Sequence, residues 1–229
     1  GSLGGALAVG GLLVDRHGDD TYAGDVLTQG AAFCGVGVLW DAGGHDTYLA
    51  QHSSQGAGFF GAGLLIDHQG DDLLSLGQLG QGLGGAHGVG LLLDGGGRDR
   101  YVADLKVSSG YDTPGVYNGW SQGIGVGFRG YAPGGLGVLI SAGDGDDTYQ
   151  AGDFSQGTGY FFGLGILADS GGDDHYQGAR YSQGSAAHQA TGILLDDAGD
   201  DIYHGSVGAN QGAAWDAAIA VLVDLAGDD

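Results

Sequence analysis

The side chains that could do chemistry in this chain are aspartates, which recur in pairs along its whole length. The first member of each pair, the anchor aspartate, follows a Leu-x dipeptide, and the second aspartate comes five residues later. The anchor positions are Asp15, Asp41, Asp67, Asp94, Ser141, Asp169, Asp196 and Asp224. The second positions are Asp20, Asp46, Asp72, Asp99, Asp147 (displaced by one inserted residue), Asp174, Asp201 and Asp229.

The charge of the chain supports a special role for these carboxylates. The 229 residues carry 28 acidic side chains against six basic ones, and no glutamate is among them. A surface that is merely solvated would use both acids, so the exclusive use of aspartate indicates short carboxylates held near the backbone, in turns or around cations. A net charge of −22 argues against a nucleic acid or an anionic membrane as partner. No stretch reads as a membrane span.

The aspartate pairs belong to a repeat. Successive anchors are 26, 26, 27, 47, 28, 27 and 28 residues apart. Each unit also carries Leu two residues before the anchor and Gly (Ala in the last unit) four before it. Gln-Gly follows about fourteen residues after the anchor in the units that reach that position, except that it is delayed to Gln122 after Asp94. Tyr stands two residues after the second aspartate in all but one of the units that reach that position. A period in this range is the signature of a solenoid, in which each repeat contacts its neighbours.

The run before each anchor predicts a β-strand. In Gly35–Trp40, for example, Gly and Leu alternate with Val and Trp, which is the period of two that strands show. Glycine disfavours helices by about 1 kcal/mol per residue relative to alanine, and 54 glycines are present. We therefore predict an all-β fold: one domain, residues 1–229, forming a parallel β-solenoid of about eight 26–28-residue rungs. Residues 212–220 are the one place where a helix fits the sequence.

The turn between the two aspartates has two interpretations. Stacked rungs place equivalent residues about 4.8 Å apart, where carboxylates repel one another and where calcium, a hard cation that takes oxygen ligands, would relieve the repulsion. Alternatively, Asp at the first position and Gly at the fourth form an ordinary type I turn, with the anchor carboxylate bound to a backbone amide. The recurring second aspartate favours calcium.

One turn also resembles a known family. Residues 142–149, Ala-Gly-Asp-Gly-Asp-Asp-Thr-Tyr, resemble the calcium-binding nonapeptide of the repeats-in-toxin family, and the other turns match its second half. The resemblance covers about eight residues per rung and departs from the family in its longer period. It implies calcium as cofactor and an extracellular or cell-surface location. The expected ligands are Asp15, Asp20, Asp41, Asp46, Asp67, Asp72, Asp94, Asp99, Asp144, Asp147, Asp169, Asp174, Asp196 and Asp201.

Residues 102–136 form an enlarged rung in which two insertions flank one strand. Insertions in solenoids often line the binding face, and aromatic and basic residues gather here on an otherwise acidic chain. A glycan or anionic ligand would suit them, and a lid over an apolar face is the alternative. Asp104 and Asp112 could act as catalytic acids only if the insertions fold together. The candidate binding residues are Lys106, Tyr111, Tyr117, Trp120, Arg129 and Tyr131.

The remaining rows predict packing. The glutamines are expected to form an amide ladder in which the side chains satisfy one another, and the tyrosines to pack with their hydroxyls in solvent. Cys34, the single cysteine, is expected in the core. Both faces of the pre-anchor strand are apolar, but only one can point into the solenoid. Self-association through the other face, or a partner that covers it, is therefore expected.

These features predict a noncatalytic, calcium-stabilised β-solenoid that serves as an extracellular or cell-surface structural or adhesion module. The alternative is a carbohydrate-active β-helix, glycan-binding or polysaccharide-degrading, with its cleft at the enlarged rung. The two hypotheses differ in where the functional residues lie: along every turn, or in one rung.

Overall fold

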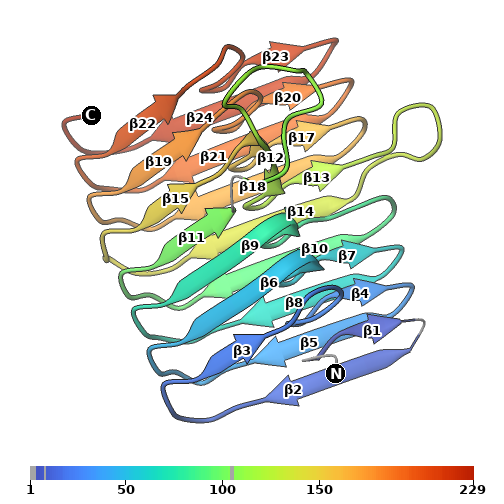
Figure 1. Ribbon diagram of the computed structural model, residues 1–229. Helices are drawn as coiled ribbons and strands as arrows, with labels where there is room; N and C mark the ends of the chain where they lie inside the picture. The colour runs from blue at the N-terminus through green and yellow to red at the C-terminus, as the bar shows by residue number, and fades with distance from the viewer. Residues whose placement is uncertain (1–3, 8, 104–105) are drawn as a thin grey trace.

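The chain forms a parallel β-solenoid, as the repeat predicts, in a computed structural model that describes residues 4–7, 9–103 and 106–229 (Figure 1). Every pairing between two named strands is parallel and joins equivalent residues of successive rungs, so Leu39 lies between Leu13 and Leu65. Within those ranges the chain contains no helix. The expectation of a helix at residues 212–220 is wrong, because this segment contributes strands to two sheets, as every other rung does.

The first wall, here called the leucine sheet, contains the pre-anchor strands. Its eight strands place Gly and Leu toward the interior and the intervening side chains outward, because neighbouring residues of a strand point to opposite faces. In chain order the strands are β2 (Gly10–Val14), β5 (Val36–Trp40), β8 (Ala62–Ile66), β10 (Val89–Asp94), β14 (Leu136–Ser141), β18 (Leu164–Asp169), β21 (Thr191–Asp196) and β24 (Ile219–Asp224).

The second wall, the tyrosine sheet, faces the leucine sheet across the main core. The rings of Tyr149 and Tyr176 are stacked with their centroids 4.7 Å apart, and Tyr101 and Tyr203 extend this stack. Tyr22 and Tyr48 form a separate stacked pair on the other side of Leu74. The buried leucines and tyrosines pack into one continuous cluster. The strands are β3 (Thr21–Ala23), β6 (Thr47–Ser54), β9 (Leu73–Gly80), β11 (Arg100–Ala103), β12 (Asn118–Ser121), β15 (Thr148–Gln150), β16 (Asp153–Ser155), β19 (His175–Gly178) and β22 (Ile202–Gly205).

A third, narrow wall, the corner sheet, closes the other end of each rung. Its two-residue strands cover a second apolar cluster that includes Phe59, Leu83 and Ile124. Cys34 lies at this corner and is exposed, so its expected place in the core is wrong. The strands are β1 (Ala6–Leu7), β4 (Ala32–Phe33), β7 (Gly58–Phe59), β13 (Gly125–Val126), β17 (Gly159–Tyr160), β20 (Ala186–Ala187) and β23 (Ala214–Trp215).

The glutamine row fixes the turn into the corner sheet. Each glutamine of the row has a positive φ, and the side chain bonds the backbone rather than other amides: Nε2 of Gln55 donates to the carbonyls of Tyr48 and Ser75, at 3.1 and 3.0 Å. The expected amide-to-amide ladder is therefore wrong. Because the two carbonyls belong to successive rungs, the glutamine joins them.

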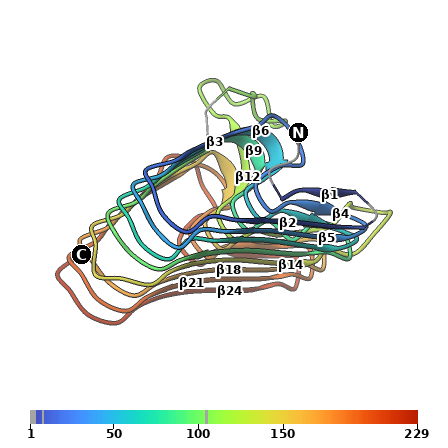
Figure 2. The ribbon, with the colours of Figure 1, turned by 90° about the horizontal axis from the view of Figure 1, so that it is seen from below.

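The enlarged rung carries two loops that leave the solenoid body in different directions (Figures 1 and 2). Residues 106–117 lie beside the tyrosine sheet, where Arg180 bonds both Asp153 and Thr113. Residues 127–135 project from the corner between β13 and β14. Asp104 lies outside the described residues.

The interior glycines of the leucine sheet lie where two walls touch, and this closeness gives a test of the fold. A Cβ on Gly137 would lie 1.9 Å from the carbonyl oxygen of Ile124. We expect Gly137→Ala to lower the free energy of unfolding by roughly 1–3 kcal/mol, because the walls must separate. Chemical denaturation measures this change.

Gly208→Ala is the matched control for this substitution. Nothing lies within 4 Å of the Cβ that it would add, so its effect should stay within about 0.5 kcal/mol. Equal losses in both variants would contradict the close approach of the walls.

Candidate cation site in the aspartate turns

The anchor aspartates follow or end the strands of the leucine sheet, and from Asp41 onward both of their oxygens accept hydrogen bonds. Oδ1 of Asp41 accepts the amide of Gly43 at 2.9 Å, which is the turn predicted from the sequence. Oδ2 accepts a tyrosine hydroxyl from the preceding rung: Tyr48 donates to Asp67 at 2.5 Å and Tyr176 to Asp196 at 2.6 Å. The expectation that these hydroxyls reach solvent is wrong, since they lie in the core and orient the anchor carboxylates.

The second aspartates bind the backbone of the neighbouring rung. Oδ1 of each accepts the amide of the second aspartate one rung earlier, for instance Asp46 N–H to Asp72 at 2.6 Å. Seven such bonds, 2.6–3.0 Å long, run without a break from Asp20 to Asp229. A glutamate carries one more methylene, so the same amide would be reached only if the side chain folded back. This explains the use of aspartate.

The other oxygen of most second aspartates has no hydrogen-bond partner. Oδ2 is buried and unpaired on Asp46, Asp72, Asp99, Asp174 and Asp201, residues that are 0–3% exposed. A buried acceptor without a donor costs free energy, and a buried unpaired charge costs more. Each of these oxygens therefore needs a hydrogen-bond donor or a cation, and a proton on the carboxyl or a bound metal ion would meet this need.

The unpaired oxygens face other carboxylates. Each group of three joins the second aspartate of one rung with the anchor and second aspartates of the next, and one carboxylate oxygen from each lies within 4.8 Å of the others. The five groups found among the described residues are Asp20–Asp41–Asp46, Asp46–Asp67–Asp72, Asp72–Asp94–Asp99, Asp174–Asp196–Asp201 and Asp201–Asp224–Asp229.

Burial makes ionisation of these groups unfavourable. Loss of solvent, with repulsion from Asp94 and Asp147, raises the pKa of Asp99 to about 9. The same causes, with Asp169 as the nearest repelling charge, raise the pKa of Asp174 to about 9. Burial raises the pKa of Asp72 to about 8. Without a cation, these raised pKa values favour the protonated carboxyl at neutral pH, and the anchor oxygens within 4.8 Å are the acceptors with which the proton could be shared.

The Ser141 rung shows which partner the second aspartates need. Ser141 replaces the anchor aspartate there, and its hydroxyl donates to Oδ2 of Asp147 at 2.8 Å. Asp147 consequently has no unpaired oxygen and belongs to none of the five groups. In this rung the Ser141 hydroxyl, a neutral donor, satisfies the second carboxylate oxygen that a proton or a cation would satisfy in the other rungs.

A second exception lies in the adjacent rung. Leu74 replaces the tyrosine that would donate to Asp94. In the following rung Ser141 replaces the anchor aspartate that would accept the hydroxyl of Tyr101. Tyr101 donates instead to Asp94 of its own rung, at 2.9 Å. The two departures from the repeat, at positions 74 and 141, thus compensate one another through the changed partner of Tyr101.

The structure brings together ten of the fourteen predicted metal ligands in the five groups. Asp144 is exposed and lies apart, and Asp15, Asp147 and Asp169 belong to no group. The prediction omitted two members of the last group, Asp224 and Asp229, although both continue the spacing of the repeat.

A second row of side chains on the outside of the same turns was also missed. Oδ1 of Asp173 accepts the amide of Asp200 in the following rung at 3.0 Å, and Asp146 accepts that of Asp173. These bonds run in the opposite direction to those of the second aspartates. The repeated Gly-x-Asp-Asp sequence was the available signal.

The candidate binding residues of the enlarged rung divide between different places. Trp120, Arg129 and Tyr131 line one pocket of about 390 Å³ together with Phe59 and Tyr160. Its lining is dominated by aromatic and aliphatic side chains, and Arg129 is the charged member. The structure therefore brings three of the six predicted residues together.

The other three candidates lie elsewhere. Tyr111 lies under the guanidinium of Arg180, 4.4 Å from its ring centre. Tyr117 lines a separate hollow of about 240 Å³ that also contains the exposed Asp112. Lys106 lines neither this hollow nor the aromatic pocket.

The raised pKa values predict how stability depends on pH when no metal is bound. Carboxyls with folded-state pKa values of about 8–9 against an ordinary 3.8 bind protons that the unfolded chain has released. Their stabilising effect is fully present below about pH 4 and is lost as the pH rises toward 9. In EDTA, the melting temperature should fall steadily from pH 5 to pH 9. A melting temperature that rises over this range would contradict the shared protons.

Asp99→Asn replaces the proton expected on the Asp99 carboxyl by the NH₂ group of asparagine, which is a donor at every pH. Its Oδ1 keeps the bond to the Asp72 amide, and its NH₂ group takes the place of the unpaired oxygen beside Asp94. We expect a higher melting temperature than the wild type in EDTA at pH 8 and a weaker dependence on pH.

Asp147→Asn is the control, because Asp147 already receives a hydroxyl from Ser141. We expect this variant to be no more stable than the wild type under the same conditions. A gain equal to that of Asp99→Asn would show that the unpaired oxygen is not the cause.

Comparison with known proteins adds no family to this picture. The chain matches no protein-family model, no curated protein and no solved structure. Among the described residues, no helix is long and apolar enough to cross a membrane. The function must therefore be argued from the aspartate turns and the enlarged rung themselves.

Proposed function

We propose that the protein is a noncatalytic β-solenoid that calcium stabilises along its aspartate turns, and that it serves as an extracellular or cell-surface structural or adhesion module. One observation carries the proposal: each of the five groups of three aspartates contains a buried, unpaired carboxylate oxygen, and the three groups away from the chain ends contain two. Groups of this kind recur along the axis, as expected of a structural element rather than of one active site.

The donor set favours calcium over other common cations. Carboxylate oxygens suit hard cations, whereas zinc in structural sites takes mainly cysteine and histidine. Magnesium demands near-ideal octahedral geometry and dehydrates reluctantly, so a buried, irregular set of carboxylates suits it poorly. Calcium accepts irregular sets of oxygens, and tyrosine hydroxyls and backbone carbonyls stand close to the aspartates.

The charge of the chain gives calcium a second effect. Much of the net charge of −22 lies along one edge of the solenoid, in stacked turns. Each bound calcium would cancel two of these charges and release the shared proton of its group. Extracellular modules bind calcium with dissociation constants of about 10⁻⁴–10⁻³ M, which is the range that suits the proposed location.

The test is thermal unfolding at pH 7.5 in EDTA and then in millimolar calcium. We expect calcium to raise the melting temperature, by the equivalent of about 2.7 kcal/mol at a concentration 100 times the dissociation constant. The gain should increase with pH, since calcium needs the deprotonated carboxylates.

Two variants make this test specific. Asp72→Asn removes one carboxylate from two groups and should reduce the gain from calcium, whereas Asp144→Asn, at an exposed position outside the groups, should leave it unchanged. An unchanged melting temperature in calcium, with no metal found by elemental analysis, would overturn the proposal and leave the shared protons as the stabilising partner.

Ligand binding at the enlarged rung is a second candidate function, and the aromatic pocket favours it. Its volume lies in the range of small-molecule sites, and Arg129 offers one positive charge beside Trp120 and Tyr131. A glycan with an acidic sugar would place a ring face on the aromatic side chains and its carboxylate on Arg129.

Tryptophan fluorescence tests this second function. Oligomers of a uronic acid should change the emission of the wild type, neutral glucose oligomers should do so less, and Arg129→Gln should remove the difference. Trp120→Phe should abolish the change, whereas Trp215→Phe, far along the corner sheet, should not. No response to either sugar would exclude the pocket as a glycan site.

A further inference from the structure

The outward faces of the two large walls differ in chemistry. On the leucine sheet, eight strands contribute three outward positions each, and twenty-two of these twenty-four are apolar; the others are Gly10 and Thr191. None is charged. The tyrosine sheet presents Thr, Gln, His and Arg among its outward residues, such as Thr148, Gln150 and His204. The preference of apolar residues for strands does not by itself explain the apolar outward face of the leucine sheet, because the outward face of the tyrosine sheet is largely polar.

No described segment covers this face. In Figure 2 the leucine sheet forms the lower boundary of the molecule, while both loops of the enlarged rung lie on other sides. Residues at its ends are well exposed, with Leu12 at 70% and Ile219 at 62%. In the middle, Val138 is partly shielded only by the strands beside it.

The size of the face matches that of a stable interface. Eight strands spaced about 4.8 Å apart, each five residues long at about 3.3 Å per residue, cover roughly 600 Å². Two such faces would bury roughly 1,200 Å² together, which reaches the range of specific protein–protein interfaces. Monomers rarely expose one apolar patch of this extent without using it.

We propose that two copies of the chain pack leucine sheet against leucine sheet to form a dimer. The face complements a copy of itself because every rung offers a similar short row, made mostly of Val, Leu and Ile, at the same height. Such a contact is isologous and closes on itself, so it yields dimers and not fibres. The packing is that of a β-sandwich, with about 10 Å between the sheets.

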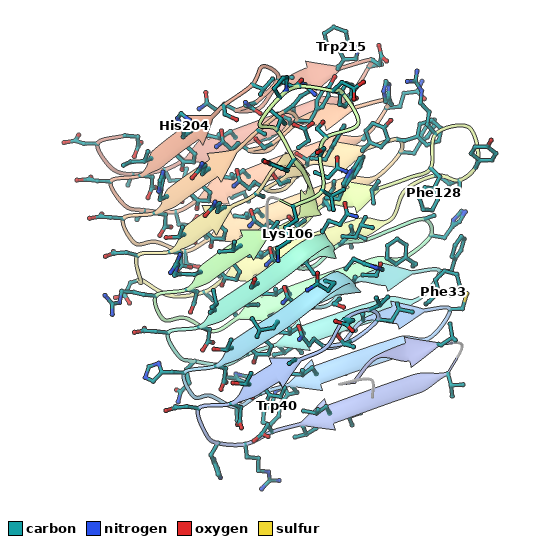
Figure 3. The ribbon with its side chains drawn as sticks, viewed as in Figure 1. Phe33, Trp40, Lys106, Phe128, His204 and Trp215 are labelled. Atoms are coloured by element: carbon teal, nitrogen blue, oxygen red, sulfur yellow. The ribbon has the colours of Figure 1, made fainter. Side chains whose placement is uncertain are left out.

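The distribution of charge agrees with this occupant. The aspartate turns lie at one edge of the face and not on it, so two copies meet without burying a carboxylate. At the opposite edge the corner sheet and the loop of residues 127–135 add exposed aromatic side chains, among them Phe33, Phe128 and Trp215 (Figure 3). The bodies, each with a charge of −22, repel at long range, so added salt should favour association.

Sedimentation and light scattering test the proposal. We expect the wild type to have the mass of two 22.8 kDa chains and Val138→Lys, at the centre of the face, to have the mass of one. Leu64→Lys, on another rung, should act in the same way. Ile202→Lys is the matched control, since it places the same charge on an exposed apolar position of the tyrosine sheet and should leave the dimer intact.

Small-angle scattering of the wild type gives a readout that depends on no variant. Two solenoids packed side by side double the thickness of the particle, whereas end-to-end stacking doubles its length. A wild type that stays monomeric in high salt would overturn the proposal. So would an end-to-end dimer, or a dimer that both Val138→Lys and Leu64→Lys leave intact.

Discussion

The structure depends on one hydrogen bond, from a backbone amide to the aspartate of the next rung. The bond fixes the height of each rung and requires a side chain as short as aspartate. It also places carboxylates in a continuous stack inside a buried turn, where loss of solvent and mutual repulsion oppose their charge. The second oxygen of each stacked aspartate then needs a donor or a cation. Ser141 supplies a donor in one rung, and the proposed calcium sites would supply the cation in the others.

Much of the architecture could be predicted from the sequence, because the spacing of equivalent residues in a repeat shows which residues of neighbouring rungs lie side by side. The Leu-x-Asp spacing gave the rung length, and alternation in segments such as Gly35–Trp40 gave the strands and their two faces. The same reasoning placed a helix at 212–220 because alanine is ambiguous when taken alone. Pairing with β20 and β21 decides the matter, and such long-range contacts are not visible in one segment.

The site was predictable in its residues but not in its bonding. The recurrence of Asp46 and Asp72 marked them as ligands, yet nothing in the sequence showed that one oxygen would bind an amide and the other remain unpaired. The tyrosine hydroxyls were expected in solvent, because alternation along a strand shows which face a ring lies on. It does not show which group of the opposite sheet the hydroxyl meets. The pocket around Trp120 depends on how the loop of residues 127–135 folds back, which spacing does not determine.

The compensation among Leu74, Tyr101 and Ser141 has a consequence for how such an array can change in length. An ordinary rung gives its tyrosine to the next anchor and takes one from the rung before, so a whole unit could be duplicated or deleted with the remaining partners still matched. The stretch from Leu74 to Asp147 behaves differently, since each of its exceptions is correct only beside the others. It would have to be inherited as one block, and gain or loss of repeats is tolerated on either side of it.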